Sequence, residues 1–265
     1  MSLWRREAGN FFGALGFFTR LPVPAWVGYA ADQLHNSARY FPLVGLLVGA
    51  LGALAFVLAA LVWPKPLAVL AALALTIYIT GAFHEDGLSD MADGFGGGWT
   101  REQVLAIMKD SRVGSYGVIA LVLMLLGRFL ALLELPTVVL PWALLAGHSL
   151  SRCAATSLLK FLDYARADAA PEASAKARPV ARRLGWGELL VALCLCLPGL
   201  FWLAPRVPPL ALAQGLLLAV LATLWLGRLM ARRLGGYTGD CLGATQQVSE
   251  LAFYLGLLGS LWTST

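Results

Sequence analysis

The sequence has few charged residues for its length. Charged residues make up 13% of the 265 positions and hydrophobic residues 59%, whereas about a quarter of a soluble domain is charged. A water-soluble fold of this composition would have too few polar side chains to cover its surface. The apolar residues also occur in long runs separated by short polar stretches, which is typical of successive membrane spans. The composition therefore predicts an all-α polytopic bundle of transmembrane helices.

The four cysteines lack the spacing of a metal site or of a disulfide framework. Cys153, Cys194 and Cys196 fall in apolar runs and Cys241 falls in a polar one. We therefore interpret all four as small buried hydrophobic residues. The sequence also shows no long repeat, low-complexity segment or separate soluble domain. We expect residues 1–265 to form a single integral membrane domain.

About seven apolar runs are each near the roughly 20 residues that cross about 30 Å of hydrocarbon. We expect spans at residues 42–63, 66–83, 115–134, 137–159, 188–204, 208–227 and 248–262. Gly45, Gly49 and Ala53 recur at every fourth position of the first span and predict a close-packed helix surface. Residues 4–21 mix phenylalanines with arginines and lack a small-residue cleavage site, so they predict an interfacial amphipathic helix rather than a signal peptide.

Basic residues gather on one side of these spans. The side that holds the N-terminus also receives residues 84–114, 160–187 and 228–247. All Lys and Arg residues lie on this side except Lys65 and Arg206 on the other side, and Arg128 and Arg152 inside spans. By the positive-inside rule this side faces the cytoplasm. The net charge of +5 then reflects topology and contact with anionic membrane lipids, and we expect no nucleic-acid partner.

The most informative segment is acidic and follows the second expected span. Glu85, Asp86, Asp90 and Asp93 lie there among glycines. A charged side chain in hydrocarbon costs roughly 2.5–3.5 kcal/mol, so this segment must face water or a polar cavity. On a helix, the three aspartates would stand at i, i+4 and i+7 and share one face. Mg²⁺ selects carboxylate oxygens, so we predict a Mg²⁺ site here; the alternative is a solvated acidic loop.

A basic and glycine-containing segment precedes the third expected span. Lys109, Asp110 and Arg112 stand just before Gly114 and Ser115. Such a segment is typical of an anion-binding helix start, although basic residues beside a span are also ordinary markers of topology. Next to an acidic metal cluster, it would supply the phosphate-binding half of the site.

A second polar segment on the same side, residues 235–250, is rich in glycine and contains Asp240 and Glu250. We predict that Asp240 contacts the metal or the substrate, while the alternative is a flexible loop between helices. Together these observations place the expected active site in cytoplasmic loops at residues 84–114 and 228–250.

Ionisable residues inside spans are candidate functional residues. Arg152 and His148 share one face of the fourth span. Arg128 lies in the third span, where pairing with Glu134 or snorkelling to the interface would also account for it.

Together these segments resemble the cobalamin synthase family, also called adenosylcobinamide-GDP ribazoletransferase. The matching stretches, in order along the chain, are residues 18–24, 40–45, 84–94, 110–117 and 239–244, with Gln247 and Glu250. The sequence departs from the family pattern at Glu85, where we expect an apolar or neutral residue, and at Ser89, where we expect alanine. Neither departure affects the three aspartates.

The resemblance implies transfer of the adenosylcobinamide phosphate group from its GDP-activated form to α-ribazole or its 5′-phosphate, with release of GMP. It also implies Mg²⁺ dependence, a location in the cytoplasmic (inner) membrane and small-molecule substrates as the partners besides lipid. A homo-oligomer is compatible with the sequence. The expected roles are metal binding by Asp86, Asp90 and Asp93; catalysis by Asp110 or Asp240; and substrate binding by His84, Lys109, Arg112, Arg152, Gln247 and Glu250.

Three other functions are alternatives. A CDP-alcohol phosphotransferase also uses an Asp-rich helical membrane site, but its Asp-Gly-x-x-Ala-Arg signature is absent here, because Asp86-Gly87 is followed by Leu88-Ser89-Asp90. A cation transporter would place carboxylates within the spans rather than beside them. A structural scaffold would leave the paired polar segments unexplained.

Overall fold

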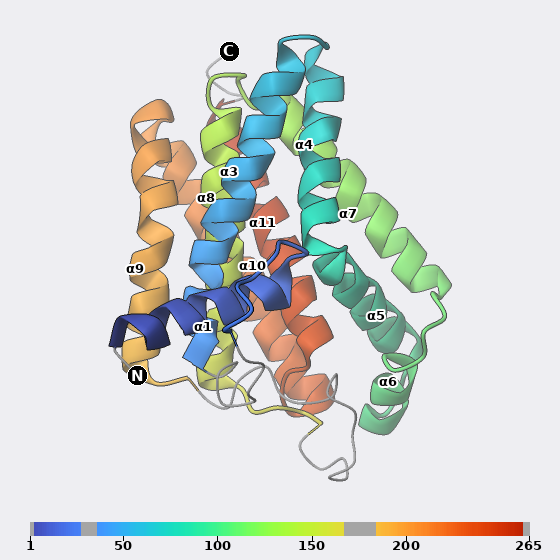
Figure 1. Cartoon of the computed structure of the whole chain (residues 1–265). Coiled ribbons are helices and arrows are strands. Elements are labelled where there is room, and N and C mark those ends of the chain that lie inside the picture. Colours follow the sequence, from blue (N-terminus) through green and yellow to red (C-terminus); the bar gives the residue numbers. More distant parts are fainter. Residues whose placement is uncertain (1–2, 28–35, 167–183, 262–265) are drawn as a thin grey trace.

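The computed structural model describes residues 3–27, 36–166 and 184–261 of the chain, which form a helical bundle (Figure 1). The helices are α1 (Leu3–Phe18), α3 (Phe41–Ala60), α4 (Lys65–Thr80), α5 (Phe83–Gly97), α6 (Arg101–Ile107), α7 (Ser115–Glu134), α8 (Leu140–Phe161), α9 (Trp186–Leu203), α10 (Pro209–Leu234) and α11 (Gly239–Leu261). Within these described residues, the one β-type pairing is an isolated bridge between Tyr164 and Tyr237. The expected all-α class is confirmed.

Several helices are long and apolar enough to cross a membrane. Among the described residues, four helices meet both requirements alone, namely Ala38–Ala60, Ser115–Glu134, Trp186–Arg206 and Pro209–Leu234. The bent pair α4 and α5 is a candidate for a fifth span. Helices α8 and α11 have 22 and 23 residues, but their buried polar side chains lower their hydropathy. The chain is therefore a membrane protein, and the expected number of seven spans stays a prediction.

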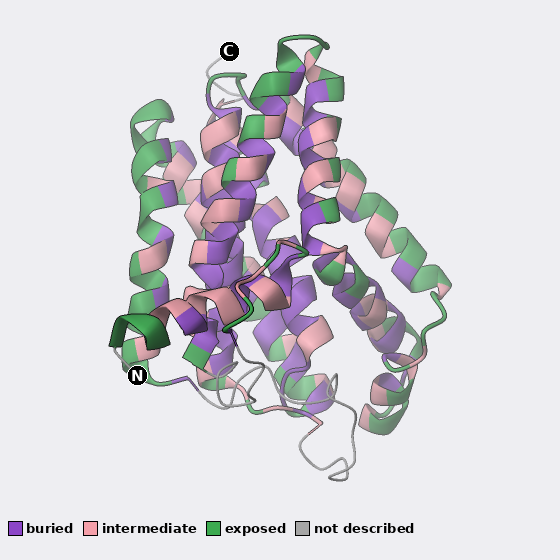
Figure 2. Ribbon diagram, viewed as in Figure 1, coloured by how far each residue is buried: buried purple, intermediate pink, exposed green. Residues whose placement is uncertain are grey.

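Lipid contact also explains the outer surface of the bundle. Helices α7, α9 and α10 expose large apolar side chains along much of their length, and Figure 2 shows the exposed strips on α7 and α9. Examples are Leu123, Leu197, Phe201 and Leu221. Side chains of this kind would be unfavourable in water over so large an area, whereas a bilayer accommodates them.

The polar segments were expected to be loops, and this expectation is corrected. Residues 83–97 form helix α5, and only residues 235–238 separate α10 from α11. Helix α11 begins at Gly239 rather than at 248. Hydropathy places the start too late because Gln246, Gln247 and Glu250 are buried and hydrogen-bonded to other buried side chains. The polar composition of these segments predicted loops, but they are helical because their buried polar side chains find hydrogen-bond partners.

The acidic helix does not continue the second span. Gly81 and Ala82 both adopt left-handed conformations, with φ of 65° and 57°, and the axis turns by 85° between α4 and α5. A left-handed conformation costs a non-glycine residue such as Ala82 roughly 1–2 kcal/mol. The backbone amide of Arg20 donates to the carbonyl of Ile79 at 2.8 Å, which ties the end of α1 to this turn. The turn directs the carboxylates away from the axis of α4.

Helix α1 runs across the bundle rather than along it (Figure 1). Its buried face includes Ala14, Leu15 and Phe18, whereas Trp4 near its start is exposed. Glu7 accepts hydrogen bonds from Arg39 and from Tyr40, which connects α1 to the start of α3. This amphipathic crossing helix agrees with the expected interfacial helix.

Helices α3 and α8 pack with their backbones in close contact. A Cβ atom on Gly45 would lie 2.3 Å from the carbonyl oxygen of His148, and one on Gly49 would lie 2.7 Å from that of Leu144. Contacts this short are possible only for glycine, because the obstructing atoms belong to the backbone. The expected close-packed surface of the first span is confirmed.

We predict that Gly49→Val lowers the stability of the purified protein in detergent, because the added side chain must separate α3 from α8. The expected loss is about 1–3 kcal/mol. Thermal unfolding can be followed with a thiol-reactive dye, since Cys153, Cys196 and Cys241 are buried. The matched control is Ala50→Val at the exposed neighbouring position. Equal melting temperatures for the two variants would contradict the close packing.

Candidate active site

The candidate site forms where α5 crosses the start of α11. A Cβ atom on Gly87 would lie 2.8 Å from the carbonyl oxygen of Asp240, and one on Gly243 would lie 3.4 Å from Cα of His84. The absence of side chains at these two glycines allows the helices to approach closely. The crossing brings Asp240 beside the carboxylates of α5, as expected from the sequence.

The carboxylates of this crossing repel one another. Asp86 is exposed, whereas Asp90 and Asp240 are partly buried. Partial burial, followed by repulsion from Asp86, Asp240 and Asp93, raises the pKa of Asp90 to about 7. Burial also raises the pKa of Asp240, against the lowering effect of Arg166. The cluster therefore carries more negative charge than its surroundings balance, which favours binding of a cation.

Arg166 is the residue of this site that the sequence did not reveal. Its Nη2 lies 3.2 Å from Oδ2 of Asp240. The chain is held here by two backbone hydrogen bonds of 2.8 Å, from Ala165 to Tyr237 and from Tyr237 to Asp163. In the sequence Arg166 is one of many basic residues of its segment, all of which were attributed to membrane topology. No local pattern separates it from the others.

Asp93 has a different environment from Asp86 and Asp90. Its carboxylate accepts hydrogen bonds from the amides of Gly114 at 2.7 Å and Gly117 at 2.9 Å, and it is 8% exposed. It therefore caps the start of α7, where negative charge is stabilised by the helix dipole. The start of α7 therefore binds an anionic group of the chain itself, the carboxylate of Asp93, and phosphate binding by the segment before α7 stays a prediction.

The Mg²⁺ site expected at Asp86, Asp90 and Asp93 stays a prediction. Over the described ranges of the chain, no three His, Cys, Asp or Glu side chains converge closely enough to hold an ion. The spacing of i, i+4 and i+7 is realised on α5. However, the carboxylate of Asp93 accepts hydrogen bonds from the backbone amides of Gly114 and Gly117 at the start of α7.

Asp110 and Arg112 pair with each other. Nη2 and Nε of Arg112 lie 2.6 Å and 3.1 Å from Oδ2 of Asp110. This contact lowers the pKa of the exposed Asp110 carboxyl to about 2, with the side-chain hydrogen bond as the main cause. So weak a base is poorly suited to accept a proton near neutral pH. Lys109 is exposed beside this pair.

Behind the crossing lies a network of buried polar side chains from α5, α7, α8 and α11. Arg128, which is 1% exposed, donates to Glu250 at 2.7 Å and to Gln247 at 2.9 Å. Gln247 donates in turn to Glu85 at 2.9 Å. Further donors to Glu250 are Ser151, Gln246 and Tyr254. This network satisfies the buried charge of Glu250 from several helices at once.

The network changes several expectations. For Arg128, pairing with Glu134 or snorkelling was the alternative to a functional role, and neither occurs because its side chain is buried against Glu250. Gln247 and Glu250, expected to bind substrate, have protein partners in this network. Glu85, the departure from the family pattern, lies 3.4 Å from Arg128 and belongs to the same network.

Arg152 and His148 share a face of α8, as expected. Nη1 of Arg152 donates to the carbonyl oxygen of His148 at 3.0 Å and lies 3.3 Å from its Nδ1. His148 Nδ1 also lies 3.2 Å from Glu250. Arg152 therefore connects this network to the residues around His84, with which it lines a pocket.

We predict that Arg128→Gln and Glu250→Gln each reduce stability by about 3–5 kcal/mol, because each leaves the opposite charge buried without its partner. The double variant Arg128→Gln/Glu250→Gln should lose less than the sum of the single losses. Unfolding of the three variants in detergent measures this coupling. Strict additivity would show that the two charges do not stabilise each other.

We predict that Asp90 makes stability depend on pH in the absence of divalent cations. Its folded-state pKa of about 7 exceeds the ordinary value of 3.8, so its protonated form favours folding and stability falls as the pH rises towards 7. The melting temperature in EDTA should therefore be lower at about pH 8 than at about pH 5.5. Asp90→Asn should reduce this difference. An unchanged pH dependence in that variant would contradict the assignment.

Comparison with known proteins identifies the family. The family model described as cobalamin-5-phosphate synthase matches residues 10–258. A protein of Shewanella frigidimarina (strain NCIMB 400) named adenosylcobinamide-GDP ribazoletransferase is 45% identical, over 96% of both chains. Proteins of the same name from Leptothrix cholodnii (strain ATCC 51168 / LMG 8142 / SP-6) and Ralstonia nicotianae (strain ATCC BAA-1114 / GMI1000) are 47% identical over 97% of both chains and 46% identical over 100% of both chains. No solved structure matches the chain. The matched length and the identities show that the chain belongs to the cobalamin-5-phosphate synthase family.

Proposed function

We propose that the carboxylates at the crossing of α5 and α11 are the active site of a transferase of cobalamin biosynthesis. The reaction moves the adenosylcobinamide phosphate group from its GDP-activated form to α-ribazole or its 5′-phosphate and releases GMP. Family membership supports the reaction. The observation that carries the location is the acidic cluster of Asp86, Asp90 and Asp240, in which partial burial and then repulsion between the carboxylates raise the pKa of Asp90 to about 7.

The carboxylates at this crossing fit Mg²⁺ if the substrate supplies the remaining ligands of the ion. Mg²⁺ is usually held by one or two carboxylates together with substrate phosphates and water. Asp86 and Asp90, on one face of α5, would hold the ion, with Asp240 across the crossing as a further ligand or contact. When bound, Mg²⁺ neutralises charge on the phosphoryl oxygens and on the departing GMP. Asp93 instead positions α5 against α7 through Gly114 and Gly117.

Asp240 is the better candidate for the general base. Its pKa is raised by burial, whereas the pKa of Asp110 is about 2, so Asp240 accepts a proton more readily. In the proposed step, the ribose hydroxyl gives its proton to Asp240 and its oxygen bonds to the phosphorus of the cobinamide phosphate. The bond from that phosphorus to the bridging oxygen breaks, and this oxygen leaves with GMP. Arg166, at 3.2 Å from Asp240, orients the carboxylate.

The site is proposed to face the cytoplasm from the inner membrane. Support comes from the distribution of basic residues, which places the segments around α5, α6 and the start of α11 on the positive side of the bundle. Arg101 and Arg233 lie on this side and donate to backbone carbonyls of Leu234 and Gly98 at 2.9 Å and 2.6 Å. GDP-activated substrates would reach the site from this side.

We predict that Asp86→Asn and Asp90→Asn each reduce turnover by at least about 100-fold, because the charge at the reacting phosphate is no longer balanced. Turnover is measured as GMP release that requires adenosylcobinamide-GDP, α-ribazole and Mg²⁺ together. Glu102→Gln, an exposed acid on the neighbouring α6, is the matched control and should retain activity. Normal turnover in both aspartate variants would remove the metal assignment.

A further inference from the structure

Two arginine side chains connect the region of α5 and α6 to the end of α10. Arg101, the first residue of α6, donates from Nε to the carbonyl oxygen of Leu234 at 2.9 Å. Arg233 donates in the opposite direction, from Nη2 to the carbonyl oxygen of Gly98 at 2.6 Å. Both arginines are partly buried, and both of these bonds go to backbone rather than to an acidic side chain. Each arginine therefore fixes the main chain of the opposite element.

Arg101 also holds a third segment of the chain. Its Nη2 donates at 2.6 Å to the carbonyl oxygen of Ala165, which lies just beyond the end of α8. A guanidinium presents its N–H donors in a rigid planar fork, so one arginine can hold carbonyl groups from two different segments. Within the described ranges of the chain, the hydrogen bonds of Arg233 go to the carbonyls of Phe95 and Gly98. Of the two arginines, Arg101 is thus the one that reaches the residues after α8.

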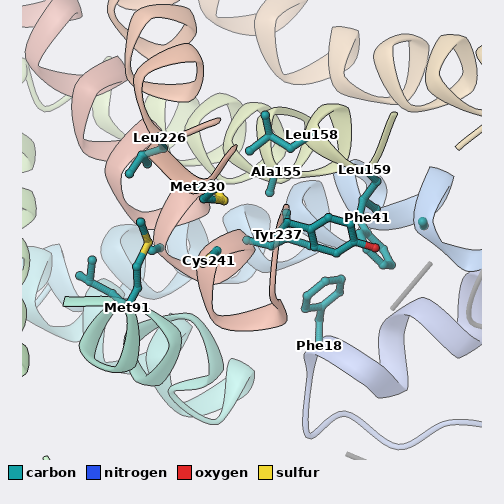
Figure 3. Packing of buried hydrophobic residues seen from close by; sticks show 14 of the residues in the cluster. Phe18, Phe41, Met91, Ala155, Leu158, Leu159, Leu226, Met230, Tyr237 and Cys241 are labelled. Atoms are coloured by element: carbon teal, nitrogen blue, oxygen red, sulfur yellow. The ribbon is translucent and has the colours of Figure 1, made fainter. Parts of the chain in front are cut away.

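The segment that Arg101 holds pairs with the residues that lead into α11. The amide of Ala165 donates to the carbonyl of Tyr237, and the amide of Tyr237 donates to the carbonyl of Asp163, both at 2.8 Å. Tyr237 is 2% exposed, and Figure 3 shows it among the buried side chains of the core, together with Cys241 of α11. The core therefore fixes one side of this pairing, and Arg101 fixes the other.

The position of Ala165 determines where the next side chain begins. Because a peptide group is planar, the carbonyl oxygen of Ala165 shares a plane with N and Cα of Arg166. Hydrogen bonds at both the amide and the carbonyl of Ala165 therefore restrict the starting point of the Arg166 side chain. Nη2 of that side chain lies 3.2 Å from Oδ2 of Asp240. An arginine of α6 is thereby connected to the acidic cluster through one peptide group and one side chain.

We propose that Arg101 is a positioning residue for the transfer reaction. By holding the carbonyl of Ala165, it keeps the Arg166 guanidinium in place beside Asp240. This assignment rests on the proposed function, in which Asp240 accepts the proton of the incoming hydroxyl. Loss of Arg101 would leave this carboxylate present but less well oriented, so the chemical step slows while substrate binding does not change.

Turnover of three variants tests the proposal. Arg101→Gln should lower kcat about 10- to 100-fold, because a small misplacement of a reacting group costs up to about this factor, while the KM for adenosylcobinamide-GDP stays unchanged. Arg166→Gln should lower kcat at least as far. The double variant Arg101→Gln/Arg166→Gln should lose no more than Arg166→Gln alone, because Arg101 acts through Arg166. Losses that multiply in the double variant, or a normal kcat in Arg166→Gln, would overturn the proposal.

Arg233→Gln is the matched control. Like Arg101→Gln, it removes hydrogen bonds from a partly buried arginine to two backbone carbonyls, yet it leaves the bond to Ala165 intact. It should therefore reduce the melting temperature by a similar amount and keep kcat near the wild-type value. An equal fall of kcat in Arg233→Gln would mean that Arg101 only stabilises the fold, and would overturn the proposal.

Hydrogen exchange measures the positioning without turnover. In the purified full-length wild type in detergent, the amide of Ala165 should be protected, because it donates to Tyr237. Arg101→Gln should raise its exchange rate at least about 10-fold, whereas Arg233→Gln should leave that rate unchanged. Fast exchange at Ala165 in the wild type, a measurement that needs no variant to fold, would overturn the proposal.

The two measurements separate this proposal from the proposed function. If the wild type releases no GMP but Ala165 loses protection in Arg101→Gln, the proposed function is contradicted and the hold of Arg101 on this segment is supported. If Arg166→Gln loses turnover and Arg101→Gln does not, the role of Arg101 alone is contradicted.

Discussion

The ion pair between Arg128 and Glu250 is the interaction on which the rest of the structure depends. Both side chains are buried among helices that contact lipid, where an unpaired charge is strongly unfavourable. Their partners come from four helices, so α5, α7, α8 and α11 must assemble together for any of these groups to be satisfied. Glu85 connects this assembly to the acidic helix, because it lies next in sequence to Asp86 and pairs with Arg128.

Close backbone approach is the second constraint, and it sets the geometry of the candidate site. Gly87 admits the backbone of Asp240, and Gly114 and Gly117 surround the carboxylate of Asp93 so closely that a Cβ on either would lie 2.4 Å from it. These contacts fix α5 against α11 on one side and against α7 on the other. The acidic face of α5 is thereby held rigidly, which suits a site that must align a diphosphate with an incoming hydroxyl.

The structure divides the acidic residues by role. Glu85 and Asp93 satisfy protein groups and shape the fold, whereas Asp86, Asp90 and Asp240 crowd at the crossing with Arg166 beside Asp240 as a partial counter-charge. Repulsion within this second group is unfavourable for the isolated protein and favourable for binding of a cation with a diphosphate. The buried polar network stabilises the fold, so the protein tolerates this local charge repulsion. Unfavourable electrostatics of this kind are common at functional sites.

Composition and spacing determined the helical class, the membrane location, the acidic face of α5 and the family, because apolar runs and carboxylate spacing are local properties of the chain. They also predicted that Asp240 lies near that face, but only because both segments were expected on the same side of the membrane. Tertiary structure alone decided that Asp93 caps α7, that Arg128 pairs with Glu250, that Arg166 meets Asp240, and that residues 239–250 are helical. Each of these depends on which distant side chain supplies the partner for a buried polar group, and a linear sequence does not specify that pairing.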